Sequence, residues 1–306
     1  MGDIKPILLE RDGQQAKFHG SWYRGEQTNF IASKADLQRE DAVLRYILEG
    51  WTPAVPFITK GALITAFGSC FAHHISLHLT KEGYNISSKK LTLQSHLVRF
   101  GEGLVNSFSI LQQFEWALEN KDFPNDLWFS EQKDIAPIEP EIRAETKRLL
   151  NETDIFIITL GVSEIWYDKI SGEALWRAVP GHLFDPERHA FRVSTVEENR
   201  NNILRICAMI KASRPTAKVI LTLSPVPLMA TFRPISCITA SSVSKAILRV
   251  ALDEVMREIG GEDVLYFPSY EIVKDYFVDP YKEDNRHPTD QVINFVMQQF
   301  EKHYCI

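Results

Sequence analysis

The chain has 306 residues, a formal net charge of −6 and a hydrophobic fraction of 44%. This length allows one large α/β domain with a sizeable core. Because the sequence has no block of basic residues, it gives no electrostatic reason to expect a nucleic-acid partner. No apolar run approaches the roughly 18 residues of a membrane span. The segment after Met1 also lacks the apolar core of a secretory signal, so we expect a cytoplasmic protein without a membrane span.

The elements expected along the chain alternate between strands and helices. Residues 1–60 have a mixed composition, and we predict that they form an arm packed on the domain that follows. Four apolar runs are then predicted to be strands: 63–67, 154–160, 218–223 and 263–267. A weaker strand is expected near Leu91. Helices are expected at 71–82, 109–119, 140–151, 195–213 and 241–259, and after Pro288.

This alternation predicts an α/β fold for residues 61–306. Near-continuous apolar strands such as 154–160 (DIFIITL) are typical of a parallel sheet that is buried on both faces. Right-handed crossovers then give a doubly wound, flavodoxin-like three-layer α/β/α sandwich, with ligands at the carboxyl ends of the strands. Residues 165–194, rich in aromatics and glycine, follow one such end and are predicted to be an inserted lid.

Gly68-Ser69-Cys70 follows the first predicted strand and begins a helix. A small residue at this turn lets the serine side chain stand clear of the backbone, at a helix N-terminus whose N–H groups can stabilise an oxyanion. Ser69 is therefore a candidate nucleophile. The alternative is that Ser69 only caps the helix, because serine is a preferred N-cap residue.

A serine nucleophile needs a base, and the spacing Asp284-x-x-His287 precedes the last predicted helix. Three residues apart in a turn, the carboxylate can reach the imidazole and fix its tautomer, which leaves the other ring nitrogen to take the serine proton. Alone the spacing is a weak signal. Its value comes from its position, because a serine after the first strand and this pair after the last strand can meet at one sheet edge.

The string Gly68-Ser69-Cys70-Phe71-Ala72 matches the motif that names the GSCFA family, which is similar to the SGNH/GDSL hydrolases. Further segments resemble the family's blocks in the expected order: 103–110, 159–161, 223–226, 243–248, 266–271 and 283–288. The resemblance implies an SGNH-like fold with Ser69 as nucleophile and with Asp284 and His287 as the other triad members. It also implies an oxyanion hole made of the N–H groups of Ser69 and Gly103 and a polar side chain.

The sequence departs from the wider SGNH pattern at the third block. Where that pattern has G-x-N-D, with the Asn as an oxyanion donor, this chain reads Gly161-Val-Ser163-Glu164. Losing such a donor typically costs about 3 kcal/mol in the transition state, so we expect Ser163 or Asn106 to replace it. The family has a histidine soon after the segment that resembles 223–226, where this chain reads Pro227-Leu228, so the resemblance implies the triad and not the substrate.

Five residues are predicted to contact the substrate: Gly161, Glu164, Trp166, His182 and Lys245. His182 resembles a family histidine of the lid. Trp166 can stack on a sugar ring or pack the lid onto the domain. Lys245 lies in an S-x-x-K string whose partner motifs are absent, so we interpret that string as structural, although Lys245 can still line the site and bind an anionic group.

Other chemistry has weaker support. Cys70 adjoins Ser69 and is a competing nucleophile, but consecutive residues at a helix start point in different directions. His74 and His78 lie four apart on a predicted helix without the HExxH pattern, so we expect no metal. No glycine-rich nucleotide motif occurs, and we expect no cofactor. The four cysteines are expected to be free thiols.

These observations predict a serine acyl hydrolase (an esterase) or an O-acyltransferase. The substrate is expected to be an acylated carbohydrate or another small ester. The alternative is a non-catalytic module that binds a carbohydrate or another ligand on the same scaffold, because a fold does not fix a function.

Overall fold

The computed structural model describes residues 7–11, 14–18, 29–89, 94–129 and 135–306, apart from the side chains of residues 7–11, 14–18 and 102. The chain divides into two compact units, Met1–Tyr46 and Ile47–Ile306. The first unit contains an antiparallel hairpin of β1 (Ile7–Arg11) and β2 (Gln14–Phe18) and a short 3₁₀-helix, η1 (Asp36–Gln38). A π-helix, η2 (Leu44–Leu48), spans the boundary. Residues 47–60, predicted as part of the arm, thus belong to the larger unit.

The larger unit is built on a parallel sheet of four strands in the order β3-β4-β7-β8. Their bounds are Ile64–Gly68, Ile155–Leu160, Lys218–Leu223 and Val264–Phe267, within one residue of the predicted strands. Ile64 also forms a parallel bridge with Ile86, on the edge of β3 opposite β4. The strand expected near Leu91 lies outside the described residues.

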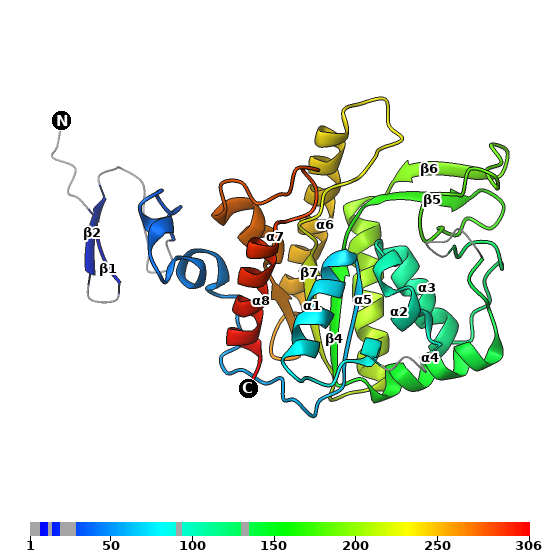
Figure 1. Cartoon of the computed structure of the whole chain (residues 1–306), viewed down its shortest axis with the longest axis horizontal. Helices are drawn as coiled ribbons and strands as arrows, with labels where there is room; N and C mark the ends of the chain where they lie inside the picture. The colour runs from blue at the N-terminus through cyan, green and yellow to red at the C-terminus, as the bar shows by residue number, and fades with distance from the viewer. Residues whose placement is uncertain (1–6, 12–13, 19–28, 90–93, 130–134) are drawn as a thin grey trace. The chain divides into compact units, whose positions relative to one another are not determined.

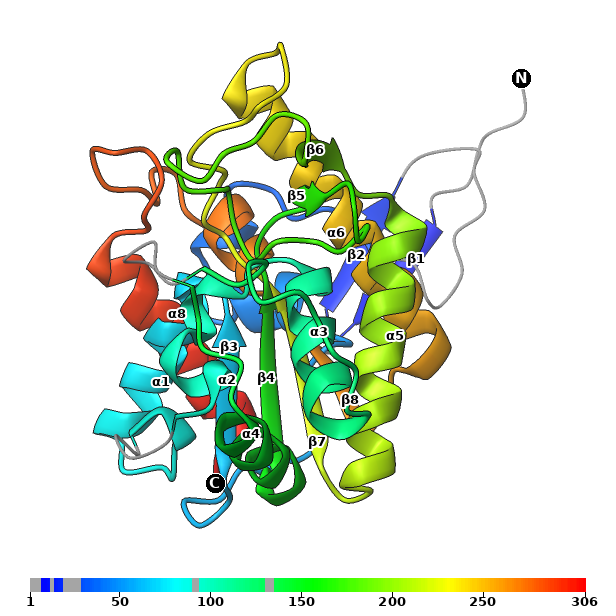
Figure 2. The same cartoon turned by 90° about the vertical axis from the view of Figure 1, so that its right-hand side faces the viewer.

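Helices cover both faces of this sheet (Figures 1 and 2). One face carries α1 (Cys70–Lys81) and α8 (Asp290–Tyr304). The other carries α3 (Ser107–Leu118), α4 (Pro140–Glu152), α5 (Val196–Ser213) and α6 (Cys237–Ile259). Shorter elements connect them: η3 (Ser87–Lys89), α2 (His96–Arg99), η4 (Gly101–Gly103), α7 (Ser269–Glu271) and η5 (Ile272–Tyr276). The predicted three-layer α/β/α fold is confirmed.

The core lies on both sides of the sheet because the strands are apolar along their whole length. Every residue of β3, β4 and β8 is buried, and in β7 only Lys218 is partly exposed. An aromatic cluster of Trp116, Trp128 and Trp176, all fully buried, fills the space around His96.

The segment predicted as a lid contains two strands that we did not expect. β5 (Glu164–Asp168) and β6 (His189–Val193) form an antiparallel hairpin. Asp168, at the loop end of this hairpin, is buried and accepts a hydrogen bond from Arg188 Nε at 2.9 Å. Figure 2 shows the hairpin at the end of the sheet toward which the parallel strands run. Among the described helices, none is long and apolar enough to cross a bilayer.

Candidate active site

Ser69 stands at the turn between β3 and α1. Gly68, the last residue of β3, has a φ angle of 126°, and a Cβ atom there would lie 2.0 Å from the backbone oxygen of Thr159. Only glycine fits such a position. Ser69 caps α1, because its Oγ accepts the N–H of Phe71 at 3.2 Å. The serine hydroxyl therefore lies at a helix N-terminus, where the helix dipole favours negative charge.

The predicted contact between Asp284 and His287 is present. Asp284 Oδ2 lies 2.5 Å from His287 Nδ1, and Oδ1 accepts the backbone N–H groups of Arg286 and His287, both at 3.0 Å. Asn285 makes this turn possible with a φ angle of 52°. The backbone N–H of His287, its imidazole and the N–H of Arg286 lower the pKa of Asp284 to about 2. Asp284 is thus an ionised acceptor at neutral pH.

The two ring contacts of His287 determine its tautomer. Nδ1 faces a carboxylate, which can only accept, so Nδ1 carries the proton. Nε2 lies 3.2 Å from Arg286 Nη1, and a guanidinium can only donate. Both contacts are satisfied by a neutral ring with its lone pair on Nε2. A general base for a serine needs this tautomer.

A cavity of about 670 Å³ joins Ser69 and His287. Gly103 and Gly161 line it too, and further wall residues come from 177–181 of the lid and from the segment after β7. Ser69, Gly161 and the segment after β7 follow the carboxyl ends of parallel strands, where ligands bind in such sheets, and His287 precedes α8. Within the described part of the chain, Ser69 and His287 share the cavity without a direct hydrogen bond.

The sequence profile of the GSCFA family matches residues 63–300. The chain belongs to the GSCFA family. No curated protein matches it. Similar solved structures include a candidate GDSL-like lipase from Parabacteroides merdae, with 11% identity, a TM-score of 0.40, and 81% of this chain and 98% of that chain covered. A carbohydrate esterase family 3 protein from Talaromyces cellulolyticus has 10% identity and a TM-score of 0.39, with 79% of this chain and 95% of that chain covered. A GDSL-like lipase from Bacteroides thetaiotaomicron has 13% identity and a TM-score of 0.39, with 79% of this chain and 86% of that chain covered.

Both backbone donors predicted for the oxyanion hole of this GSCFA protein make hydrogen bonds within the protein. The N–H of Ser69 donates to Thr159 O at 3.1 Å, which extends the ladder between β3 and β4. The N–H of Gly103 donates to Phe100 O at 2.8 Å, within η4. An oxyanion hole made from these groups requires both bonds to be exchanged when substrate binds.

The two polar side chains proposed as replacement donors are also engaged. Asn106 caps α3 through Oδ1, which accepts the N–H of Ser109 at 2.8 Å. The hydroxyl of Ser163 donates to Ser244 Oγ at 3.2 Å, and the Ser163 N–H donates to the same oxygen at 2.9 Å. Neither Asn106 nor Ser163 is among the residues that line the cavity. This geometry therefore gives both side chains a structural role.

Lys245 ties two strand ends together beneath the site. Its Nζ donates to Gly161 O at 2.8 Å and to Ser224 O at 2.7 Å, and the residue is only 4% exposed. Burial, with Arg286 nearby, lowers the pKa of Lys245 to about 7. Lys245 lines an adjoining cavity of about 530 Å³ that shares Arg286 with the first. Its hydrogen bonds make it a positioning residue for the loops after β4 and β7.

Of the other predicted substrate contacts, Gly161 lines the Ser69 cavity, whereas Glu164, Trp166 and His182 do not. Glu164 is buried and accepts the hydroxyl of Thr231 at 2.8 Å. Trp166 packs edge-on against Phe232, with ring centroids 4.8 Å apart. His182 is exposed and does not line the cavity. Glu164 and Trp166 thus contact Thr231 and Phe232, in the segment that precedes α6.

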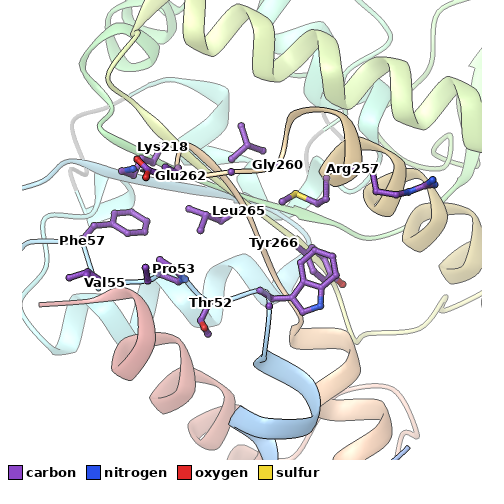
Figure 3. Close-up of a pocket in the computed structure, with 16 residues that line it drawn as sticks. Thr52, Pro53, Val55, Phe57, Lys218, Arg257, Gly260, Glu262, Leu265 and Tyr266 are labelled. Atoms are coloured by element: carbon purple, nitrogen blue, oxygen red, sulfur yellow. Dashed lines mark hydrogen bonds between the residues drawn. The ribbon is translucent and has the colours of Figure 1, made fainter. Parts of the chain in front are cut away.

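Two further features lie away from this site. A cavity of about 680 Å³ at the amino-terminal end of the sheet is lined by Lys218, Leu265 and neighbouring residues, and it contains no predicted site residue (Figure 3). His78 Nε2 lies 2.9 Å from Glu301 Oε2. Among the described residues, no group of three or more His, Cys, Asp and Glu is arranged to hold a metal.

Sequence reasoning missed the two arginines of the Ser69 cavity, Arg177 and Arg286. Arg177 belongs to the predicted lid. Arg286 lies inside the Asp284-x-x-His287 motif itself, next to the histidine. An arginine within the motif that supplies the base is a signal that could have identified Arg286. Nothing in the sequence distinguishes Arg177 from other lid residues.

Proposed function

We propose that this GSCFA protein is a serine acyl hydrolase or O-acyltransferase that works through an acyl intermediate on Ser69. One observation carries the proposal. A serine hydroxyl at a helix N-terminus and an imidazole with its lone pair on Nε2, contributed by opposite ends of the domain, line the same cavity. Nucleophilic acyl transfer needs these two groups together.

In the proposed reaction, Ser69 Oγ attacks the carbonyl carbon of an ester while His287 Nε2 takes the hydroxyl proton. Asp284, ionised at neutral pH, stabilises the imidazolium that forms. The bond between the carbonyl carbon and the alcohol oxygen then breaks, and the proton passes from His287 to the leaving alcohol. Water or a second alcohol attacks the acyl group in the same way, which releases an acid or a new ester and restores Ser69.

The size and lining of the cavity support a small ester as substrate. A volume of about 670 Å³ is in the range typical of small-molecule sites. Val105, Phe129, Val179 and Val226 give it apolar wall area that suits an acyl chain. We propose an acylated carbohydrate or a comparable small ester, with water or a sugar hydroxyl as the final acceptor.

A second candidate function is ligand binding without catalysis. It is favoured by the hydrogen bonds that occupy the N–H groups of Ser69 and Gly103, since a decayed oxyanion hole leaves a cavity that binds but does not turn over. The two functions differ in one observable property, which is whether the ester carbonyl is attacked.

Hydrolysis of 4-nitrophenyl acetate tests the proposal. We expect turnover by the wild type, none above background with Ser69→Ala, nearly as large a loss with His287→Ala, and retained activity with the matched control Cys70→Ala. When a sugar is added to the assay, release of acetate indicates a hydrolase, and formation of a sugar ester indicates an acyltransferase. If Cys70→Ala were inactive and Ser69→Ala active, the nucleophile would be misassigned. If well-folded wild type turned over no ester, the binding function would be favoured.

A further inference from the structure

In the part of the chain that the structure describes, the charged side chains that line the Ser69 cavity are cationic. Among the described residues that line it, the only permanent charges belong to Arg177 and Arg286, and no Asp or Glu contributes to the wall. His287 is the remaining ionisable group besides Cys70. Two guanidinium groups from distant parts of the chain therefore face a space of about 670 Å³ together with the candidate nucleophile.

Arg286 is held by weak contacts next to the base. Its Nη1 donates to His287 Nε2 at 3.2 Å, and its Nε donates to Pro227 O at 3.4 Å. It forms no ion pair with any carboxylate in the part of the chain that the structure describes. A partly buried guanidinium stays charged and matches a carboxylate with two parallel hydrogen bonds. Arg286 is thus suited to exchange its present partners for an anion.

Arg177 enters the same cavity from the lid. A Cβ atom built on Gly103 would lie 2.0 Å from Arg177 Nη2, so the guanidinium occupies the space that the missing side chain leaves. Gly103 and Arg177 both line the cavity. The glycine of the predicted oxyanion hole is therefore also the residue that lets this cation approach the site.

The position of Arg286 has a direct consequence for the base. While Nη1 donates to Nε2, the lone pair that must accept the Ser69 proton is occupied. A positive charge at this distance also disfavours the imidazolium that forms during acyl transfer. A ligand that moves Arg286 away and neutralises it removes both obstacles. An anion favours this displacement more than a neutral group of the same shape does, so neutral esters are expected to turn over more slowly than anionic ones.

We propose that the substrate is an ester that carries a second, anionic group such as a carboxylate, bound by Arg286 and Arg177. Binding of that group releases Nε2 of His287, so that the base becomes available when the correct substrate is in place. This inference rests on the proposed acyl-transfer function. It adds the class of substrate and the residues that select it.

Paired esters test this inference. 4-Nitrophenyl glutarate carries its carboxylate on the acyl side, and 3-acetoxybenzoate carries it on the alcohol side. The methyl ester of each is the neutral control. We expect wild type to prefer one carboxylate probe over its methyl ester in kcat/KM. The pair that responds identifies the side on which the anion lies. In Arg286→Gln this preference falls about 10- to 100-fold, as expected for the loss of a charge-assisted hydrogen bond.

Arg257→Gln is the matched control. Arg257 pairs with Asp253 on the surface of α6 and lines the cavity of about 680 Å³ at the amino-terminal end of the sheet. This variant therefore removes the same charge without changing the Ser69 cavity. Its preference should equal that of the wild type. If wild type hydrolysed both members of each pair equally, with turnover lost in Ser69→Ala, only this inference would be overturned. The same holds if Arg286→Gln kept the full preference. Turnover of no ester by folded wild type overturns the proposed function, and this inference with it.

Discussion

Replacing Gly68 by alanine tests whether the turn before Ser69 is built as described. The φ angle of 126° is a conformation that non-glycine residues adopt at a cost of about 1–3 kcal/mol. The new Cβ would also lie 2.0 Å from Thr159 O, a backbone atom of the neighbouring strand, so the ends of β3 and β4 must separate. Such overpacking typically costs a further 1–3 kcal/mol or so. We expect a loss of about 4 kcal/mol in the free energy of unfolding.

Gly172→Ala provides the control, because Gly172 has a φ angle of 75° but nothing within 4 Å of a built Cβ atom. It should cost only about 1–2 kcal/mol, the price of the backbone conformation alone. Urea denaturation measures both variants, and a lower midpoint at constant slope reports stability. A Gly68→Ala protein no less stable than Gly172→Ala would refute the close approach of the two strands.

Three further predictions concern titratable groups. Burial lowers the pKa of His96 to about 4, so below pH 6.5 the unfolded chain binds a proton that the folded chain excludes. Between pH 7 and 4, the free energy of unfolding of the wild type should therefore fall by about 3 kcal/mol more than that of His96→Phe, as measured by urea denaturation. Burial lowers the pKa of Lys245 to about 7, so the unfolded chain binds more protons than the folded chain between pH 7 and 10.5. Between pH 7 and 9 the wild type should therefore gain about 2 kcal/mol of stability relative to Lys245→Met. If the free energy of unfolding changed with pH equally in the wild type and in the His96 or Lys245 variant, the burial of that residue would be contradicted. Asp284→Asn should lower kcat for an ester about 10³- to 10⁴-fold without unfolding, because His287 then loses the partner that holds its proton on Nδ1, and a loss below tenfold would exclude that role.

Much of the fold could be predicted because its signals are local. The strands are apolar runs bounded by glycine or polar residues, and β7 has the predicted bounds, 218–223. The contact between Asp284 and His287 was also predictable, since a carboxylate three residues before a histidine can reach its ring within one turn. The hairpin of β5 and β6 was missed, because the sequence of the lid has no regular alternation of apolar and polar residues.

The donors and cations of the site depend on contacts between distant segments. That the Ser69 N–H bonds to Thr159 O follows from the register of β3 on β4, which no local pattern contains. The partners of Lys245 lie on two different strand ends and are backbone oxygens, which leave no trace in the sequence. The approach of Arg177 to Gly103 likewise depends on how the lid folds back onto the domain.

Intact-protein mass spectrometry after incubation with a fluorophosphonate tests the central claim most directly, using wild type, Ser69→Ala and Cys70→Ala. An activated serine forms a covalent adduct with this reagent, whereas an N-cap serine without a base does not. We predict one adduct on wild type and on Cys70→Ala, mapping to Ser69, and none on Ser69→Ala. A folded wild type without an adduct, or an adduct that persists in Ser69→Ala, would contradict the assignment of Ser69 as the nucleophile.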